Sequence, residues 1–223
     1  GCIPPSSGGA AGIGPLFDDF NGTSIDTTQW NTSIATGCVR WQGSTADQSQ
    51  SAVWTQPTAT PPYGAIAVSG GQASFSAPSG TVYPYIWSGP PSTASAFPSS
   101  GDFSLETRIR FDQVGGNGAG LFARQWGDST PTGNNPPVAP GPVGTTGSNV
   151  LQIWSDVSGV RFVAAGQTLM VSPSPDYHVY HLDYIGGQYT ACMDGTRVGG
   201  PEASSVRPDT VWLGDAVIAS PLE

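Results

Sequence analysis

Aromatic side chains alternate with hydrogen-bonding side chains along several segments, a pattern that suits binding of a sugar. The members are Tyr85, Trp87, Arg124, Trp126, Gln152 and Trp154. The C–H faces of sugars stack on aromatic rings, whereas their hydroxyls exchange hydrogen bonds with amide and guanidinium groups. In a β-strand every second side chain points to the same face, so Gln152 and Trp154 would share one face. The alternative is that these rings pack in the protein core.

Two other segments carry charged side chains at alternate positions. If the apolar residues of segment 103–111 point inward, Glu106 and Arg108 point outward. The same reasoning sets His181 and Asp183 opposite the tyrosines of segment 178–184. If these faces belong to the same concave sheet as the aromatic set, Arg108 and His181 join the candidate ligand-binding residues. Glu106 and Asp183 are the weak catalytic candidates, as a carboxylate pair for acid–base chemistry, unless they belong to a paired surface network.

The composition excludes several classes of protein. The 223 residues include 31 Gly and 21 Pro, which are unfavourable inside helices, so short strands and many turns are expected. The net charge is −9, and the seven cationic residues are dispersed arginines. Nucleic acid is therefore a poor partner, because phosphate binding requires a basic patch. No apolar run approaches the roughly 20 residues that a membrane span needs.

The three cysteines predict one disulfide and one remaining thiol. Cys2, Cys38 and Cys192 are too scattered for a zinc-binding pattern. From their positions, we expect Cys38 to pair with Cys192 in an oxidising, extracellular compartment. Cys2 precedes a Pro/Ser/Gly stretch, as the lipidated cysteine of a bacterial lipoprotein does, so a secreted or surface protein, lipid-anchored through Cys2, is one hypothesis. A free or intermolecularly bonded thiol is the alternative.

The order of short segments predicts one β-domain behind a leader. Residues 1–14 have the composition of a flexible Gly/Pro/Ser-rich tether, and residues 15–223 form the expected domain. About ten runs with period-two alternation, separated by turn residues, predict an all-β sandwich. Their ranges are 16–20, 65–77, 81–87, 103–111, 118–126, 149–155, 160–164, 178–184, 188–194 and 210–213. Glycine pairs at 70–71 and 186–187, and Asp194-Gly195, predict hairpin turns.

Several of these segments, in this order, resemble the concanavalin A-like lectin/glucanase superfamily. They are Phe17–Trp30, Gly70–Phe75, Phe103–Phe111, Gly118–Phe122, His178–Tyr184 and Tyr189–Gly195. The resemblance spans about residues 15–215 and implies a two-sheet antiparallel jelly-roll sandwich of the laminin-G-like kind. These segments are structural signatures, so they say much less about the ligand than about the fold.

The resemblance also suggests two chemistries to look for. Laminarinase-type members carry Glu-x-Asp-x-Glu on one strand, since retaining hydrolysis needs two close carboxyl groups. Here the nearest counterpart is Gln152-Ile-Trp154-Ser-Asp156, in which an amide and an indole replace the first two carboxylates, so hydrolysis of that type is not expected. Related sandwiches commonly hold a structural calcium near the first strand, where Asp18, Asp19 and Asp26 would supply oxygens, unless these residues cap turns. No other cofactor is expected.

Three functions remain open at this point. The first is an extracellular, non-catalytic, lectin-like domain that binds a polysaccharide or glycan on its concave sheet. The second is a subunit of an extracellular filament or sheath, because no alternating run follows residues 210–213 to cover the edge beside strand 16–20, and an open edge is a template for another copy. The third is a glycoside hydrolase that uses the unconventional pair Glu106 and Asp183.

Overall fold

Fourteen β-strands make up the regular structure of the residues that the structure describes. The computed structural model describes residues 2, 18–26, 28–30, 37–41, 52–55, 65–76, 82–88, 96–111, 117–125, 149–156, 159–172 and 176–215. The strands are β1 (Gly37–Trp41), β2 (Ala52–Thr55), β3 (Ala65–Ser69), β4 (Gln72–Ser76), β5 (Val82–Ser88), β6 (Phe103–Ile109), β7 (Asn117–Arg124), β8 (Asn149–Asp156), β9 (Gly159–Ala164), β10 (Gln167–Val171), β11 (His178–Ile185), β12 (Gln188–Met193), β13 (Thr196–Ala203) and β14 (Thr210–Asp215). No helix occurs in this described part of the chain, and so none there could cross a membrane.

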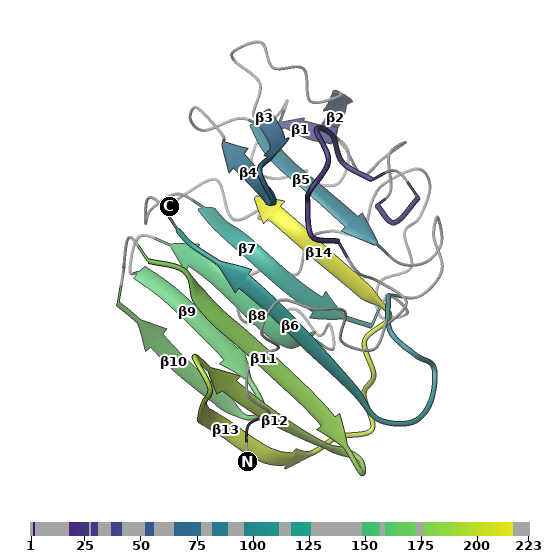
Figure 1. Ribbon diagram of the computed structural model, residues 1–223, viewed down its shortest axis with the longest axis vertical. Helices are drawn as coiled ribbons and strands as arrows, with labels where there is room; N and C mark the ends of the chain where they lie inside the picture. The colour runs from purple at the N-terminus through teal and green to yellow at the C-terminus, as the bar shows by residue number, and fades with distance from the viewer. Residues whose placement is uncertain are drawn as a thin grey trace.

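The strands form two large antiparallel sheets and one hairpin (Figure 1). The eight-stranded sheet has the order β10-β9-β8-β7-β14-β5-β1-β2, and the four-stranded sheet has the order β13-β12-β11-β6. The four-stranded sheet lies across the β7 to β10 half of the larger sheet, whereas the β3–β4 hairpin lies by β5 (Figure 1). This arrangement confirms the expected fold class, an all-β two-sheet jelly-roll sandwich.

The core lies between the two sheets. Leu121, Ile153 and Phe162 enter it from the eight-stranded sheet, and Tyr180 and Leu182 enter it from the four-stranded sheet; all five are at most 4% exposed. The ring centroids of Phe162 and Tyr180 are 5.1 Å apart, in the edge-to-face geometry that aromatic pairs favour. Side chains at the alternate positions of the same strands therefore point to the two outer faces.

The local sequence signals predicted the turns better than the number of strands. Gly70 and Gly71 connect β3 to β4 with φ values of 59° and 76°, which are accessible to glycine at little steric cost. The prediction missed β1, β2, β10 and β13, which lack a clear alternating pattern. Asp18–Phe20 was predicted as part of the first strand, but these residues are not in a strand, and both aspartates accept local backbone N–H groups.

A disulfide joins Cys2 to Cys192 on β12, across 190 residues of sequence. This corrects the expected Cys38–Cys192 pair, because one sulfur forms one disulfide. Spacing along the chain could not distinguish the two partners, since only the folded chain brings residue 2 beside β12. The Cys2 sulfur is bonded and so is not available for a lipid thioether. Cys38 lies on β1, in the other sheet.

Candidate functional site

The predicted ligand-binding residues divide between the two outer faces of the sandwich. Gln152 and Trp154 are on β8, in the eight-stranded sheet, whereas Arg108 and His181 are on β6 and β11, in the four-stranded sheet. The condition that all four share one concave sheet is therefore not met. Alternation within each strand was correct, but it cannot show which sheet a strand joins. We call these surfaces the Trp154 face and the His181 face.

On the Trp154 face, strand register aligns several of the predicted residues. Gln152 pairs with Phe122, which pairs with Trp212, and Trp212 pairs with Trp87. In the same way, Trp154 pairs with Gly120, Gly120 pairs with Gly214, and Gly214 pairs with Tyr85. Arg124 pairs with Asn149 and Thr210. The backbone thus brings Tyr85, Trp87, Arg124, Gln152 and Trp154 onto adjoining strands, while Trp126 lies outside the described residues.

Trp154 has an unsatisfied hydrogen-bond donor. Its side chain is 4% exposed, and the Nε1 atom is buried without any hydrogen-bond partner. The guanidinium carbon of Arg161, on the neighbouring strand β9, lies 5.2 Å from the indole centroid. Gln152 beside it is partly exposed. An unpaired buried N–H costs on the order of 1–3 kcal/mol, so an acceptor for this donor would stabilise the protein.

Only glycine fits at position 120, opposite Trp154, because two backbones approach closely there. A Cβ atom on Gly120 would overlap the carbonyl oxygen of Ile153 in β8. A β-bulge in the pairing of β7 with β8 places Val150 in the core cluster. Simple alternation along β8 would put it on the same face as Gln152 and Trp154. The physical reason is the bulge: one extra residue on β8 reverses the direction of the side chains beyond it.

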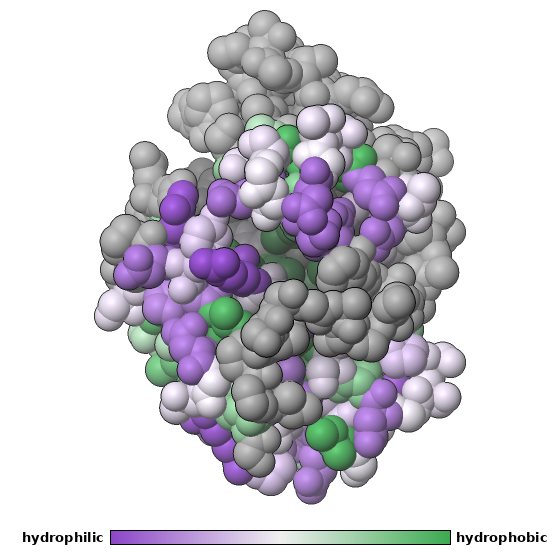
Figure 2. All heavy atoms as spheres, viewed as in Figure 1, coloured by the Kyte–Doolittle hydropathy of each residue, from purple (hydrophilic) through white to green (hydrophobic). Residues whose placement is uncertain are grey.

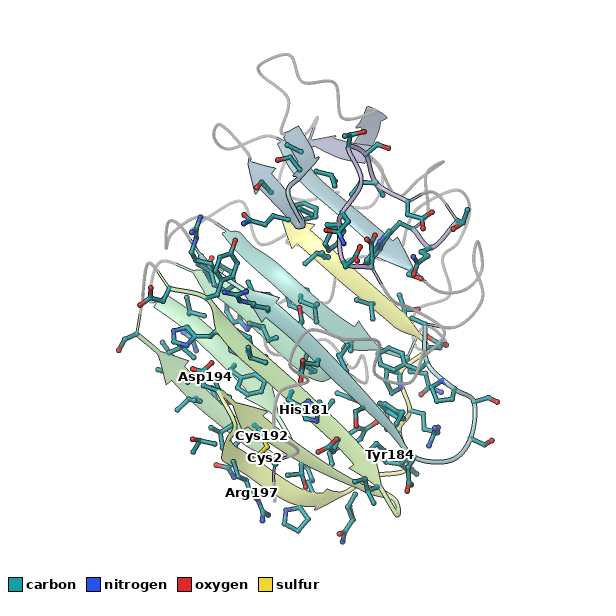
Figure 3. All side chains as sticks on the ribbon, in the orientation of Figure 1. Cys2, His181, Tyr184, Cys192, Asp194 and Arg197 are labelled. Carbon is teal, nitrogen blue, oxygen red and sulfur yellow. A yellow bond between two sulfur atoms is a disulfide. The ribbon has the colours of Figure 1, made fainter. Side chains whose placement is uncertain are left out.

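The His181 face contains a continuous chain of polar groups, although two of its members are buried. His181 Nδ1 lies 3.2 Å from Glu106 Oε2, and Nε2 lies 2.8 Å from Asp183 Oδ1. The same Asp183 oxygen accepts a 2.5 Å hydrogen bond from Ser104 Oγ. His181 is 8% and Asp183 3% exposed. Figure 3 shows His181 on β11, on the outer side near the Cys2–Cys192 disulfide.

This network limits the chemistry open to Glu106 and Asp183, the weak catalytic candidates. Glu106 and Asp183 lie on one face of neighbouring strands, but the imidazole of His181 bridges them. The Asp183 side chain is 4% exposed, against 29% for Glu106. Only Glu106 is therefore placed to meet a ligand, and Asp183 holds the imidazole. Both ring nitrogens of His181 therefore face carboxylate oxygens, which hold the ring in one orientation.

Arginines and an aromatic ring occupy the other end of the His181 face. The guanidinium carbon of Arg108 lies 4.5 Å, and that of Arg110 4.9 Å, from the ring centroid of Tyr177. Both arginines are exposed and are two positions apart on the outward side of the β6 chain. Tyr177 precedes β11 and was missed by the sequence reasoning, because it falls just before the alternating run.

His178 contributes to neither face, because it stands three positions before His181 on β11 and so points to the opposite side of the strand. Its Nδ1 lies 2.7 Å from Asp194 Oδ2, and Asp194 Oδ1 accepts the Val179 N–H at 2.9 Å. Desolvation raises the pKa of Asp194, but the hydrogen bond from Val179 and the interactions with His178 outweigh it, so this pKa lies below its ordinary value. The two histidines do not share a ligand-binding position.

The three aspartates considered for calcium act as hydrogen-bond acceptors in turns. Asp18 accepts the Phe20 N–H at 2.8 Å and the Trp30 indole N–H at 2.7 Å. Asp19 accepts both N–H groups of Asn21. Side-chain hydrogen bonds from Gln29 and Thr28, with the Thr28 backbone N–H, lower the pKa of Asp26. Within the described residues, no three His, Cys, Asp or Glu side chains form a metal-binding group.

Sequence reasoning missed three residues of these faces: Ser104, Arg161 and Tyr177. Ser104 stands on the same side of β6 as Glu106, and its contact with Asp183 depends on the pairing of β6 with β11. Arg161 stands at an alternate position of segment 160–164, which was a usable signal. Its position beside Trp154 depends on the β8–β9 register.

Comparisons with known proteins give likenesses of fold at low identity. No protein-family model matches the chain, and no curated protein matches its sequence. A β-1,3-glucanase from Mycobacterium marinum is 14% identical, with 92% of this chain and 88% of that chain covered and a TM-score of 0.48. A marine PL7 alginate lyase, AlyA1 from Zobellia galactanivorans, is 11% identical, with 89% of each chain covered and a TM-score of 0.40. A glycosidic hydrolase is 14% identical, covering 86% and 78%, with a TM-score of 0.40. None of these likenesses assigns a role to a residue of this chain.

Proposed function

We propose that this protein is an extracellular, non-catalytic carbohydrate-binding domain and that the Trp154 face holds the glycan. The observation that carries the proposal is the buried indole N–H of Trp154, which has no acceptor in the folded chain. A sugar hydroxyl or ring oxygen is an acceptor of the right kind, and it reaches this N–H when the groups that cover the 4% exposed indole move aside on binding. The partly exposed Gln152 and Arg161 on either side supply further amide and guanidinium groups for hydroxyls.

The arrangement suits binding better than hydrolysis. Gln152 and Trp154 occupy positions where hydrolysis of the laminarinase type would require carboxylates, and neither side chain can act as a nucleophile or proton donor to an acetal. On the opposite face, Asp183 is buried against His181 and Ser104. A hydrolase that uses Glu106 with Asp183 therefore lacks a second open carboxylate. The disulfide supports an oxidising, extracellular location.

The filament hypothesis still depends on an open sheet edge, but the structure places the open edges at other strands than the sequence suggested. In the segment expected to leave an open edge, 16–20, the described residues 18–20 are not in a strand. The strand β14 lies inside the eight-stranded sheet, between β7 and β5. Among the described strands, the edges of the two large sheets are β2, β6, β10 and β13. Assembly into a polymer stays a prediction, which light scattering on the purified protein tests directly.

A glycan-array screen followed by calorimetry tests the proposed function. The wild-type protein is expected to bind at least one neutral glycan, and Trp154→Phe, which keeps a ring but removes the N–H, is expected to weaken that binding about tenfold. Gln152→Ala is a second variant on the same face and should also weaken binding. If wild type binds no glycan, or both variants bind as wild type does, the proposal is wrong.

Trp30→Phe is the matched control, because the Trp30 N–H has an acceptor in Asp18 at 2.7 Å. Trp30 is 3% exposed, much as Trp154 is, so the two substitutions remove similar side-chain volumes from buried sites. Trp30→Phe should be the more destabilising of the two by about 1–2 kcal/mol, since it also breaks a hydrogen bond to a carboxylate. It should leave glycan binding unchanged.

A further inference from the structure

One end of the His181 face combines exposed cations with a partly exposed carboxylate. Arg108 and Arg110 are exposed, and the Glu106 side chain, two positions earlier on β6, is 29% exposed. Glu106 and Arg108 are alternate residues of β6, and Arg110 directly follows the last residue of that strand, so the three side chains start in a row on one side of the chain. Figure 2 shows strongly hydrophilic residues over this end of β6. The chain has seven arginines among 223 residues, so two of them only two positions apart are a local concentration of positive charge.

Both halves of the row are held in place by neighbours. The Tyr177 ring lies 4.5 Å from the Arg108 guanidinium carbon and 4.9 Å from that of Arg110, within the range of cation–π attraction. His181 contacts Glu106 at 3.2 Å and is itself fixed by Asp183. Groups immobilised before binding lose less conformational entropy when a ligand arrives, which favours a binding role for such a row.

The charges also show what kind of ligand would fit. The guanidinium groups of Arg108 and Arg110 both lie against the Tyr177 ring, so two positive charges are held near each other and a carboxylate that reaches both is attracted to each. The planar fork of an arginine matches a carboxylate, with two parallel N–H donors to two oxygens. Glu106 has up to four lone-pair sites, so it can accept sugar hydroxyls in addition to its contact with His181.

We propose that Arg108, Arg110 and Glu106 form a second saccharide-binding site, for a sugar that carries a carboxylate, that is, a hexuronate unit of an acidic polysaccharide. The two arginines hold the carboxylate, and Glu106 accepts hydroxyl groups of the same unit. Tyr177 and His181 are positioning residues. The site lies on the opposite sheet from Trp154 and does not depend on the function proposed for that face.

Calorimetry with a galacturonate pentasaccharide and its methyl ester tests the site. The ester has the same hydroxyls but no charge, so the acid is expected to bind at least tenfold more tightly than the ester. Arg108→Gln and Arg110→Gln should each weaken binding of the acid at least tenfold, because each removes charge-assisted hydrogen bonds. Glu106→Gln should weaken it about threefold. Exposed arginines are replaced here, so an unchanged melting temperature confirms that the variants are folded.

Arg197→Gln is the matched charge control. Arg197 is another exposed arginine of the same sheet, on β13, where it donates to the Gly200 carbonyl oxygen. It should leave binding unchanged, as should Trp154→Phe. Equal binding of acid and ester, equal losses with Arg197→Gln and Arg108→Gln, or no binding by wild type would overturn the site. Binding of a sulfated pentasaccharide but not of the galacturonate would overturn its assignment to carboxylates.

Discussion

The two outer faces of the sandwich differ in whether their buried polar groups have hydrogen-bond partners. On the His181 face, His181 and Asp183 are almost fully buried, yet each polar atom involved has a partner, from Ser104 at one end to Glu106 at the other. On the Trp154 face, the indole N–H is buried without any partner. Burial alone therefore does not distinguish the two faces, whereas hydrogen-bond satisfaction does.

This difference indicates a different task for each face. A satisfied network rigidifies the groups at its ends, because every member fixes the next one. That is what the site proposed around Glu106 requires. An unsatisfied donor costs stability in the free protein and regains it when a ligand supplies the acceptor. That is what the site proposed around Trp154 requires.

The largest expected effect concerns the satisfied network. Asp183→Ala leaves the buried His181 Nε2 and the Ser104 hydroxyl without their acceptor, so we expect the free energy of unfolding to fall by about 3–5 kcal/mol. Urea denaturation measures the change. Asp102→Ala is the control, because Asp102 is exposed and accepts a single N–H, from Gly186 at 3.0 Å. That control should cost about 1 kcal/mol or less. Similar losses in both variants would mean that the network contributes no special stability.

The next effect concerns the disulfide, which is attached to the His181 face through Cys192. Strand register places Cys192 opposite His181 on β11. The Cys2–Cys192 bond spans 190 residues, so Cys2→Ser should lower the free energy of unfolding by about 2–4 kcal/mol. Cys38→Ser should leave it nearly unchanged. Mass spectrometry of unreduced peptides checks the pairing, and a Cys38–Cys192 peptide would contradict this structure.

The smallest effect is the pH dependence that comes from Asp194, the partner of His178, whose pKa is lowered. A carboxylate with a folded pKa below its ordinary value of 3.8 stabilises the fold above that pH, and the contribution disappears as pH falls through the folded pKa. Melting temperatures measured from pH 5 down to pH 2 should therefore fall less steeply for Asp194→Asn than for wild type. Parallel curves would show that Asp194 contributes nothing to acid sensitivity.

The sequence alone determined the properties that depend on near neighbours in the chain. Alternation predicted that Glu106 and Arg108 share one side of β6 and that His181 and Asp183 share one side of β11, and the exposure of the residues on β6 follows it. Glycine pairs predicted the turns between β3 and β4 and between β11 and β12, since only a few residues adopt positive φ easily. These patterns, with the resemblance, were enough for the fold class.

Only the tertiary structure decided which strands lie together. It assigned β6 and β11 to one sheet and β8 to the other, so it separated His181 from Trp154. It paired Cys192 with Cys2 instead of Cys38, and it left the Trp154 N–H without an acceptor while giving one to Trp30. Each of these outcomes joins residues far apart in sequence, and their contacts depend on how the whole core packs. A period-two pattern records the face of a strand, but it contains no information about the neighbours that this face will meet.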